Sequence, residues 1–361
     1  MIEQPKISLT LRVLFAIAML GLALAFMRVS ADMLNALILA WIIVLVASPL
    51  LRWLRSKGVP TWLAFGLTLV AILAVFLTLI LFMIIALNKF AEALPAYFTE
   101  YENLVASVED GLASRGINTS DITAIVDFID PAKIIEIAAD FLGGLLGTVS
   151  GFIFVALLVV FLLLDAFNVP AKLVEEINAG NKYLKQFFQT SNTIREYVLI
   201  TTVVGLATGI LDTFWFILLG VDFAILWGIL AFLLSYIPSI GFWLAAIPPT
   251  ILALLESGPL TAALVFFGIV LINGFAENVV KPKFMGEGLN LSPFAVVFSV
   301  FFWAAILGPL GAILGVPMTV LFKELVLEAD PQNRWIAKLM SSTRKPVPQE
   351  DEGEVTVEEM E

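Results

Sequence analysis

Residues 58–88 read GVPTWLAFGLTLVAILAVFLTLILFMIIALN and contain no charged side chain. A helix needs about 20 consecutive apolar residues to cross a hydrocarbon core roughly 30 Å thick. The stretch exceeds that length, so it predicts a membrane-spanning helix that crosses with a tilt. A run this long and this apolar indicates an integral membrane protein, because its side chains are stable in the hydrocarbon core of a bilayer.

The rest of the chain repeats this pattern. Of its 361 residues, 60% are hydrophobic and 14% are charged, whereas soluble domains are nearer half apolar and a quarter charged. A soluble fold of this length has no interior large enough to bury so much apolar surface. The sequence therefore predicts an all-α, polytopic integral membrane helix bundle. Further single spans are predicted at Thr10–Val29, Met33–Leu51 (closed by Pro49), Phe141–Leu164, Tyr197–Gly220 and Ser257–Val280 (ended by Lys281-Pro282-Lys283).

Two uncharged segments are too long for one straight crossing. They are Phe223–Leu255 and Gly288–Phe322, and a helix of that size would be about 50 Å long at 1.5 Å per residue. The first is interrupted at IPSIG (Ile237–Gly241) and at Pro248-Pro249, and the second at GPLGAILGVP (Gly308–Pro317). Each segment is either a re-entrant hairpin or a single broken crossing, and the sequence leaves both possibilities open.

The distribution of charge predicts the orientation. Loop 52–57 and segment 170–196 are basic, whereas segment 89–140 is acidic with apolar positions at helical spacing. The positive-inside rule then places both termini in the cytoplasm and the acidic segment outside. The predicted organisation is membrane spans 1 to 3 in 1–88, acidic amphipathic extramembrane helices in 89–140 (broken near Gly111–Gly116 and Pro131), span 4 in 141–168, a cytoplasmic helix in 169–196, spans 5 to 8 in 197–327, and a disordered acidic cytoplasmic tail in 328–361.

The composition excludes several kinds of chemistry. The chain has no Cys and no His, which removes thiol nucleophiles, disulfides, and the usual zinc and iron ligand sets. It has no Gly-rich loop ending in Gly-Lys-Ser/Thr, so no ATP site is visible. We therefore expect no enzyme, no cofactor, no metal centre and no nucleic-acid partner, and any work must draw on an existing gradient.

Two features point to a site inside the membrane. Broken helices leave backbone groups unpaired, which is tolerated where the backbone is buried in protein or lines a wet cavity. Such breaks can also be packing kinks or glycine contacts between helices. Carboxylates in hydrocarbon are costly and often functional. Asp212 lies in the middle of one predicted span, and Glu277 lies near the end of another beside Asn273, Asn278 and Lys281. Both carboxylates are candidate coupling or gating groups, with ion pairing for assembly as the alternative.

Three motifs in order resemble the autoinducer-2 exporter (PerM-like permease) family of bacterial membrane proteins. They are SYIPSIGFWLAAIP (Ser235–Pro248), ENVVKPKFMGEGLNLSP (Glu277–Pro293) and GPLGAILGVPMTVLFKEL (Gly308–Leu325). The resemblance implies about eight membrane segments, a homo-oligomer, and transport without ATP. It assigns to the transport path, as a group, Tyr236, Pro238, Gly241, Glu277, Asn278, Pro282, Gly286, Gly308, Gly311, Gly315 and Pro317.

Three functions remain open at this stage. The first is a bacterial inner-membrane transporter that exports a small polar organic solute such as a quorum-sensing signal, with Glu277 and Asp212 as gating or coupling groups. The second is a sodium (monovalent cation)/proton antiporter that uses the same two carboxylates as ligands, since hard cations prefer oxygen. The third is a non-transporting membrane scaffold or receptor that uses segment 89–140 and the acidic tail.

Overall fold

The computed structural model describes residues 8–114, 151, 153–165, 181–285, 289–329 and 332–342. Within these ranges the chain is helical and contains no strand. The helices are α1 (Leu9–Val29), α2 (Ala31–Ser56), α3 (Thr61–Ala113), an apolar helix at Ile153–Asp165, α7 (Lys182–Leu219), α8 (Ala224–Leu234), α9 (Gly241–Ser257), α10 (Pro259–Phe275), α11 (Lys281–Met285), α12 (Pro293–Leu307), α13 (Pro309–Phe322) and α14 (Arg334–Leu339), with π-helical turns η1 (Ala276–Val280) and η2 (Lys323–Leu327).

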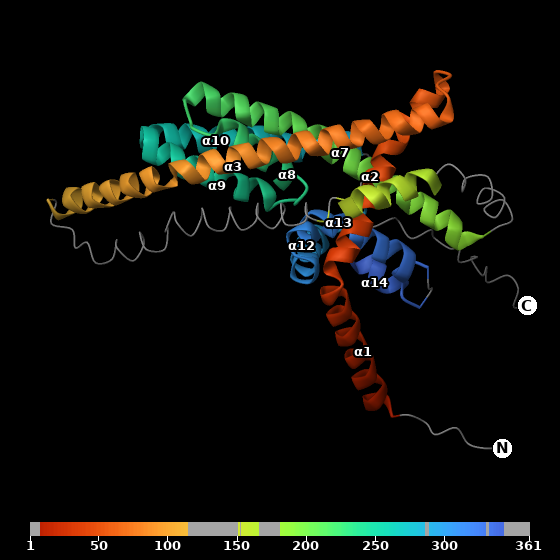
Figure 1. The fold of residues 1–361 in the computed structure, drawn as a ribbon. Helices are drawn as coiled ribbons and strands as arrows, with labels where there is room; N and C mark the ends of the chain where they lie inside the picture. The colour runs from red at the N-terminus through yellow and green to blue at the C-terminus, as the bar shows by residue number, and fades with distance from the viewer. Residues whose placement is uncertain are drawn as a thin grey trace, which may run out of the picture.

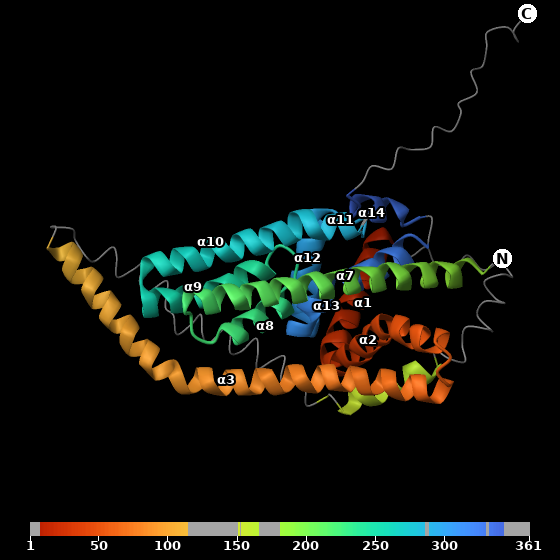
Figure 2. The same cartoon turned by 90° about the horizontal axis from the view of Figure 1, so that it is seen from above.

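Long apolar helices dominate the described part of the chain. Five stretches are long and apolar enough to cross a membrane: Ala31–Ser56, Thr61–Ser107, Lys182–Leu219, Pro259–Phe284 and Pro309–Leu327. Helices α7 and α10 pack together, and α3 runs alongside α8 and α9 (Figures 1 and 2). Helix α1 projects away from the bundle in Figure 1 and contacts it at one end, where Leu24 and Met27 pack near Trp303. The prediction of an all-α membrane helix bundle is confirmed.

Helices α7 to α10 run up and down beside one another. Gly220, at φ +71°, ends α7 and lets the chain turn back into α8. A Cβ added to Gly209 would lie 2.6 Å from the Gly228 carbonyl oxygen, so the two backbones are in direct contact. The IPSIG turn then joins α8 to α9, and Gly258, at φ +83°, precedes Pro259 at the start of α10. Segment 223–255 is therefore a hairpin of two helices, and α8, with 11 residues, is about 16 Å long.

Helices α12 and α13 form a second hairpin. Its turn is Gly308, at φ +73°, followed by Pro309 at the first position of α13. A Cβ on Gly311 would lie 2.1 Å from the Trp303 carbonyl oxygen, and one on Gly315 would lie 3.1 Å from that of Ser299. Only a glycine permits this separation at Gly311, so small residues set how closely the two helices approach. The second overlong segment is therefore also a hairpin.

Two predicted boundaries are not helix ends. Helix α3 runs from Thr61 to Ala113 without interruption, so the predicted boundary at residue 88 lies inside one continuous helix. With 53 residues it is about 80 Å long, far more than a bilayer core, and it bends towards its C-terminal end in Figure 2, the half that contains Pro95. Helix α7 likewise joins the predicted cytoplasmic helix to the following span, from Lys182 to Leu219.

Four prolines that were expected to end or break helices lie inside them. Helix α2 continues through Pro49 to Ser56, because the Ser48 hydroxyl donates to the Leu45 carbonyl at 2.9 Å and replaces the missing backbone donor. Helix α9 continues through Pro248-Pro249. The π-helical turn η1 ends at Val280, two residues before Pro282, and the helix continues through Pro282 as α11. Single π-helical turns of this kind commonly occur inside α-helices.

Several predictions concern residues outside the described ranges. These are the acidic segment beyond residue 114 with its expected break at Pro131, the first part of predicted span 4, the first part of segment 169–196, Gly286, and the tail after residue 342.

Candidate functional site

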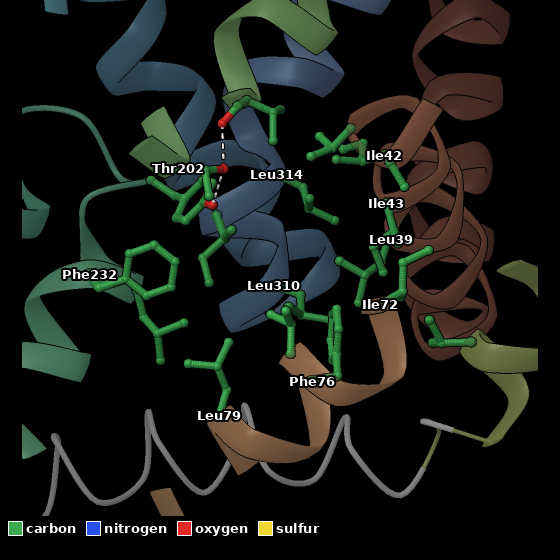
Figure 3. A pocket seen from close by; sticks show the side chains of 18 of the residues that line it. Leu39, Ile42, Ile43, Ile72, Phe76, Leu79, Thr202, Phe232, Leu310 and Leu314 are labelled. Atoms are coloured by element: carbon green, nitrogen blue, oxygen red, sulfur yellow. Dashed lines mark hydrogen bonds between the residues drawn. The ribbon is translucent and has the colours of Figure 1, made fainter. Parts of the chain in front are cut away.

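A cavity of about 450 Å³ lies where the two predicted interruptions come together. Its wall includes Tyr236, next to the IPSIG turn, and Leu310, Leu314 and Pro317 from the GPLGAILGVP motif. Helices α2, α3, α7 and α8 and Val155 complete it, and the labelled side chains in Figure 3 point inward from these elements. Segments far apart in sequence thus share one cavity, as expected for a site built on discontinuous helices.

One pair of hydroxyl groups supplies the polar side-chain atoms of this wall. Thr202 Oγ1 lies 2.7 Å from the Tyr236 hydroxyl and 2.6 Å from the Val198 carbonyl oxygen (Figure 3). The other lining side chains are aliphatic, aromatic, methionine or proline. The cavity is therefore suited to apolar groups and has one polar position.

A buried lysine stands beside the cavity, at the end of α8. Lys281, in α11, is 6% exposed. Its ammonium group donates to the Ser235 carbonyl oxygen at 3.0 Å and forms an ion pair with Glu277 one turn earlier, in η1. A cation at a helix C-terminus interacts favourably with the unpaired carbonyl groups there. Lys281 therefore caps α8 where the IPSIG turn begins.

Asp212 lies in the interior of the bundle, on α7. Its side chain is fully buried, and its Oδ2 accepts a hydrogen bond from Asn273 Nδ2 on α10 at 2.9 Å. Its Oδ1 has no partner among the described residues. Asn273, Glu277 and Lys281 follow one another at four-residue spacing, which places them on successive turns. This polar row leads from Asp212 to the carbonyl of Ser235, so the two predicted coupling carboxylates belong to one row.

The other predicted path residues have different positions. Gly241, Gly311 and Gly315 lie in close helix contacts, and a Cβ on Gly241 would lie 1.8 Å from the Leu234 carbonyl oxygen. Gly308 forms the α12–α13 turn, and Pro238 belongs to the IPSIG turn. Pro282 lies in α11, and Asn278 is exposed and donates to the carbonyl of its own helix at Gly274. The structure therefore gives these glycines a packing role, while Tyr236 and Pro317 line the cavity.

Sequence reasoning missed Thr202 and Lys323, and it placed Lys281 beside Glu277 without predicting that the lysine is buried. Thr202 is one threonine among several in an apolar helix, and nothing local marks it. Lys281 was interpreted as a span end. Lys323, in η2, is 1% exposed and donates to the Asn290 carbonyl oxygen at 2.8 Å, with Glu328 Oε1 at 3.5 Å. The sequence did offer one signal for Lys323, because this lysine directly follows Gly288–Phe322, an uncharged segment that is too long for one crossing.

A second polar cluster joins α3 to the ends of α7 and α9. The Tyr97 hydroxyl lies 2.6 Å from Glu256 Oε1 and 2.9 Å from Asp222 Oδ2, and the Asp222 amide donates to Glu256 Oε2 at 3.2 Å. Burial raises the pKa of the Glu256 carboxyl, and the hydrogen bond from Tyr97 acts in the opposite direction. Glu100 lines the adjoining cavity. Among the described residues, no three Asp or Glu side chains lie close enough together to hold a metal ion.

Comparison with known proteins places the chain in a family. The sequence pattern of AI-2E family transporters matches residues 14–329. The AI-2 transport protein TqsA of Escherichia coli K12 is 31% identical over 95% of this chain and 99% of its own length. A putative transport protein of Haemophilus influenzae is 31% identical over 91% and 96%, and YhhT of Escherichia coli K12, a putative transport protein, is 28% identical over 89% and 92%. The helix bundle, the cavity at its two hairpins and the match along nearly the whole sequence agree that this chain is a membrane protein of the AI-2E transporter family.

Proposed function

We propose that the protein exports a small organic solute across the bacterial inner membrane without ATP, by way of the cavity beside Tyr236. The observation that carries the proposal is that Tyr236 and Pro317, from the two interrupted segments, line the same cavity. TqsA bears the name of an AI-2 transport protein, which makes the quorum-sensing signal autoinducer-2 the first solute to test.

The Glu277–Lys281 pair is the proposed gate. Lys281 holds the Ser235 carbonyl, and the next residue, Tyr236, faces the cavity. Loss of the ion pair would release the end of α8 and change the position of the Tyr236 ring. Ser235 and Tyr236 are adjacent in the chain, so a shift of Ser235 would move Tyr236 directly.

The experiment is a flux measurement in proteoliposomes. Liposomes that contain the protein are loaded with autoinducer-2 or with one of a set of small organic solutes. The release rate is compared with that from equally loaded liposomes without protein. We expect Glu277→Gln to alter the rate, and Lys283→Met, at an exposed side chain outside the proposed path, to leave it unchanged. Release at the rate of protein-free liposomes for every solute would contradict the proposal.

Asp212 supports a second candidate function, a monovalent cation/proton antiporter. Its carboxylate is buried and has one oxygen without a partner among the described residues, and buried carboxylates in membranes commonly mark ion or proton pathways. The test is a sodium-dependent pH change inside vesicles. Antiport predicts that Asp212→Asn abolishes the signal. A signal that persists in this variant, or none in the wild type, would reject this function and leave solute transport untouched.

A further inference from the structure

The lining of the cavity limits what can bind there. Among the side chains that line it, those of Thr202 and Tyr236 carry oxygen atoms, and all others are apolar. A solute that is polar on every side would lose its hydration without finding replacement partners. A ligand with an apolar body avoids this loss and buries its surface against the walls supplied by α2 and α3.

The hydrogen bonds of the two hydroxyl groups determine which polar group can join them. A carbonyl oxygen only accepts, so the 2.6 Å contact between Thr202 Oγ1 and the Val198 carbonyl uses the proton of Thr202. The 2.7 Å contact between Thr202 Oγ1 and the Tyr236 hydroxyl must then use the proton of Tyr236. Both protons are occupied, so the pair offers only lone pairs to a ligand.

We infer that the cavity binds an amphiphile with an alkyl body and one hydrogen-bond donor, a hydroxyl or an amide N–H, at its polar end. A carboxylate has no proton to donate at neutral pH and would remain unpaired beside Tyr236. The volume of about 450 Å³ lies within the range of about 300–1,000 Å³ that is usual for ligand sites. This inference rests on the proposed function in taking the cavity as the solute site, and it narrows the predicted small polar solute to an amphiphilic one.

A fluorescence titration tests the ligand class. The chain has no native cysteine, so one reporter dye can be attached at Leu79→Cys, in the cavity wall, and a control dye at Leu157→Cys, which is absent from the lining. In detergent, decanol, N-decyl acetamide and decanoate are added in turn. We expect decanol and the amide to bind at least about tenfold more tightly than decanoate, because one hydrogen bond supplies roughly that factor and the carboxylate would also lose its hydration. The dye at Leu157→Cys should not respond.

Two substitutions locate the preference. Tyr236→Phe removes one of the two oxygen atoms and should reduce the preference for decanol over decanoate, whereas Thr202→Ser keeps the hydroxyl pair and should preserve it. Equal affinity of the wild type for decanol and decanoate would overturn the inference, and this comparison needs no variant to fold.

The source of the ligand is tested in liposomes. Adding a diacylglycerol, which has a free hydroxyl, to phosphatidylcholine liposomes should displace decanol if a membrane lipid is the natural occupant. Displacement by soluble N-acyl amides with no effect of diacylglycerol would instead indicate a solute from the aqueous phase, and either result supports the donor requirement. Selective binding without flux would reject transport and keep this inference. Flux of small polar solutes without selective binding of decanol would reject this inference and keep the proposed transport.

Discussion

The Glu277–Lys281 pair gives the sharpest test of how the α8–α9 hairpin is held. The Lys281 side chain is 7% exposed and that of Glu277 is 28% exposed. Glu277→Gln leaves the ammonium group buried with no counter-charge, a change that costs about 3–5 kcal/mol when one partner of a buried pair is removed. The Ser235 carbonyl remains as a neutral acceptor and does not replace the lost charge.

Removing the lysine has a different consequence. Lys281→Met takes away the buried charge and leaves the Ser235 carbonyl without its donor, a loss of about 1–3 kcal/mol. Glu277 can then turn towards water because it is partly exposed. The double variant with both substitutions has no charge to compensate, so its loss should be close to that of Lys281→Met and well below the sum of the two single changes.

The measurement is a double-mutant cycle of unfolding in mixed micelles, followed by tryptophan fluorescence over increasing dodecyl sulfate. Lys283→Met is the matched control, because Lys283 is an exposed lysine two residues further along and should change stability by less than about 0.5 kcal/mol. Additive losses in the double variant would refute the reasoning, since they would mean that the two side chains do not form a coupled pair.

Two further predictions follow from the described contacts. Gly311→Ala should destabilise the protein and separate α12 from α13, because its Cβ would lie 2.1 Å from a backbone oxygen, whereas Gly21→Ala has open space and should be neutral in the same unfolding assay. The Tyr97 hydroxyl has one proton for two carboxylates, and the pKa of Glu256 is raised by burial. Stability from this cluster is therefore present below the ordinary pKa of Glu256 and falls as pH rises through its raised value. Asp222→Asn should flatten that loss, and an unchanged pH profile would contradict the shared-proton interpretation.

The sequence predicted the helices better than it predicted their ends. Uncharged runs marked the membrane helices because burial in lipid is a property of composition. The IPSIG motif and Gly308 marked the two turns because the backbone there needs special residues. Pro49 and Pro282 did not behave as helix ends. The Ser48 hydroxyl replaces the donor that Pro49 lacks, and a π-helical turn precedes Pro282. Such compensation depends on neighbouring groups in three dimensions, which spacing along the chain does not show.

The candidate site was only partly predictable, for a related reason. Tyr236 and Pro317 could be selected because they belong to distinctive motifs. Thr202 could not, because its importance comes from a contact with Tyr236 that is 34 residues away in the chain. The apolar character of the cavity was likewise invisible, since α2 and α3 supply side chains that in sequence are indistinguishable from those facing lipid.

The arrangement of polar groups suggests why the carboxylates lie beside the cavity rather than inside it. Asn273, Glu277 and Lys281 form a row along α10 and its extension. Asp212, on α7, joins the row at Asn273, and the row ends at the Ser235 carbonyl. The cavity begins at the next residue, Tyr236. A change of charge in the row can therefore alter the contact between Lys281 and the end of α8 while the cavity keeps an apolar wall. Because the charged groups lie outside the cavity, ligand binding does not have to remove water from them. Coupling of this kind requires the α8–α9 turn to have two arrangements, and we expect the Lys281 ammonium group, which contacts both Glu277 and the Ser235 carbonyl, to select between them.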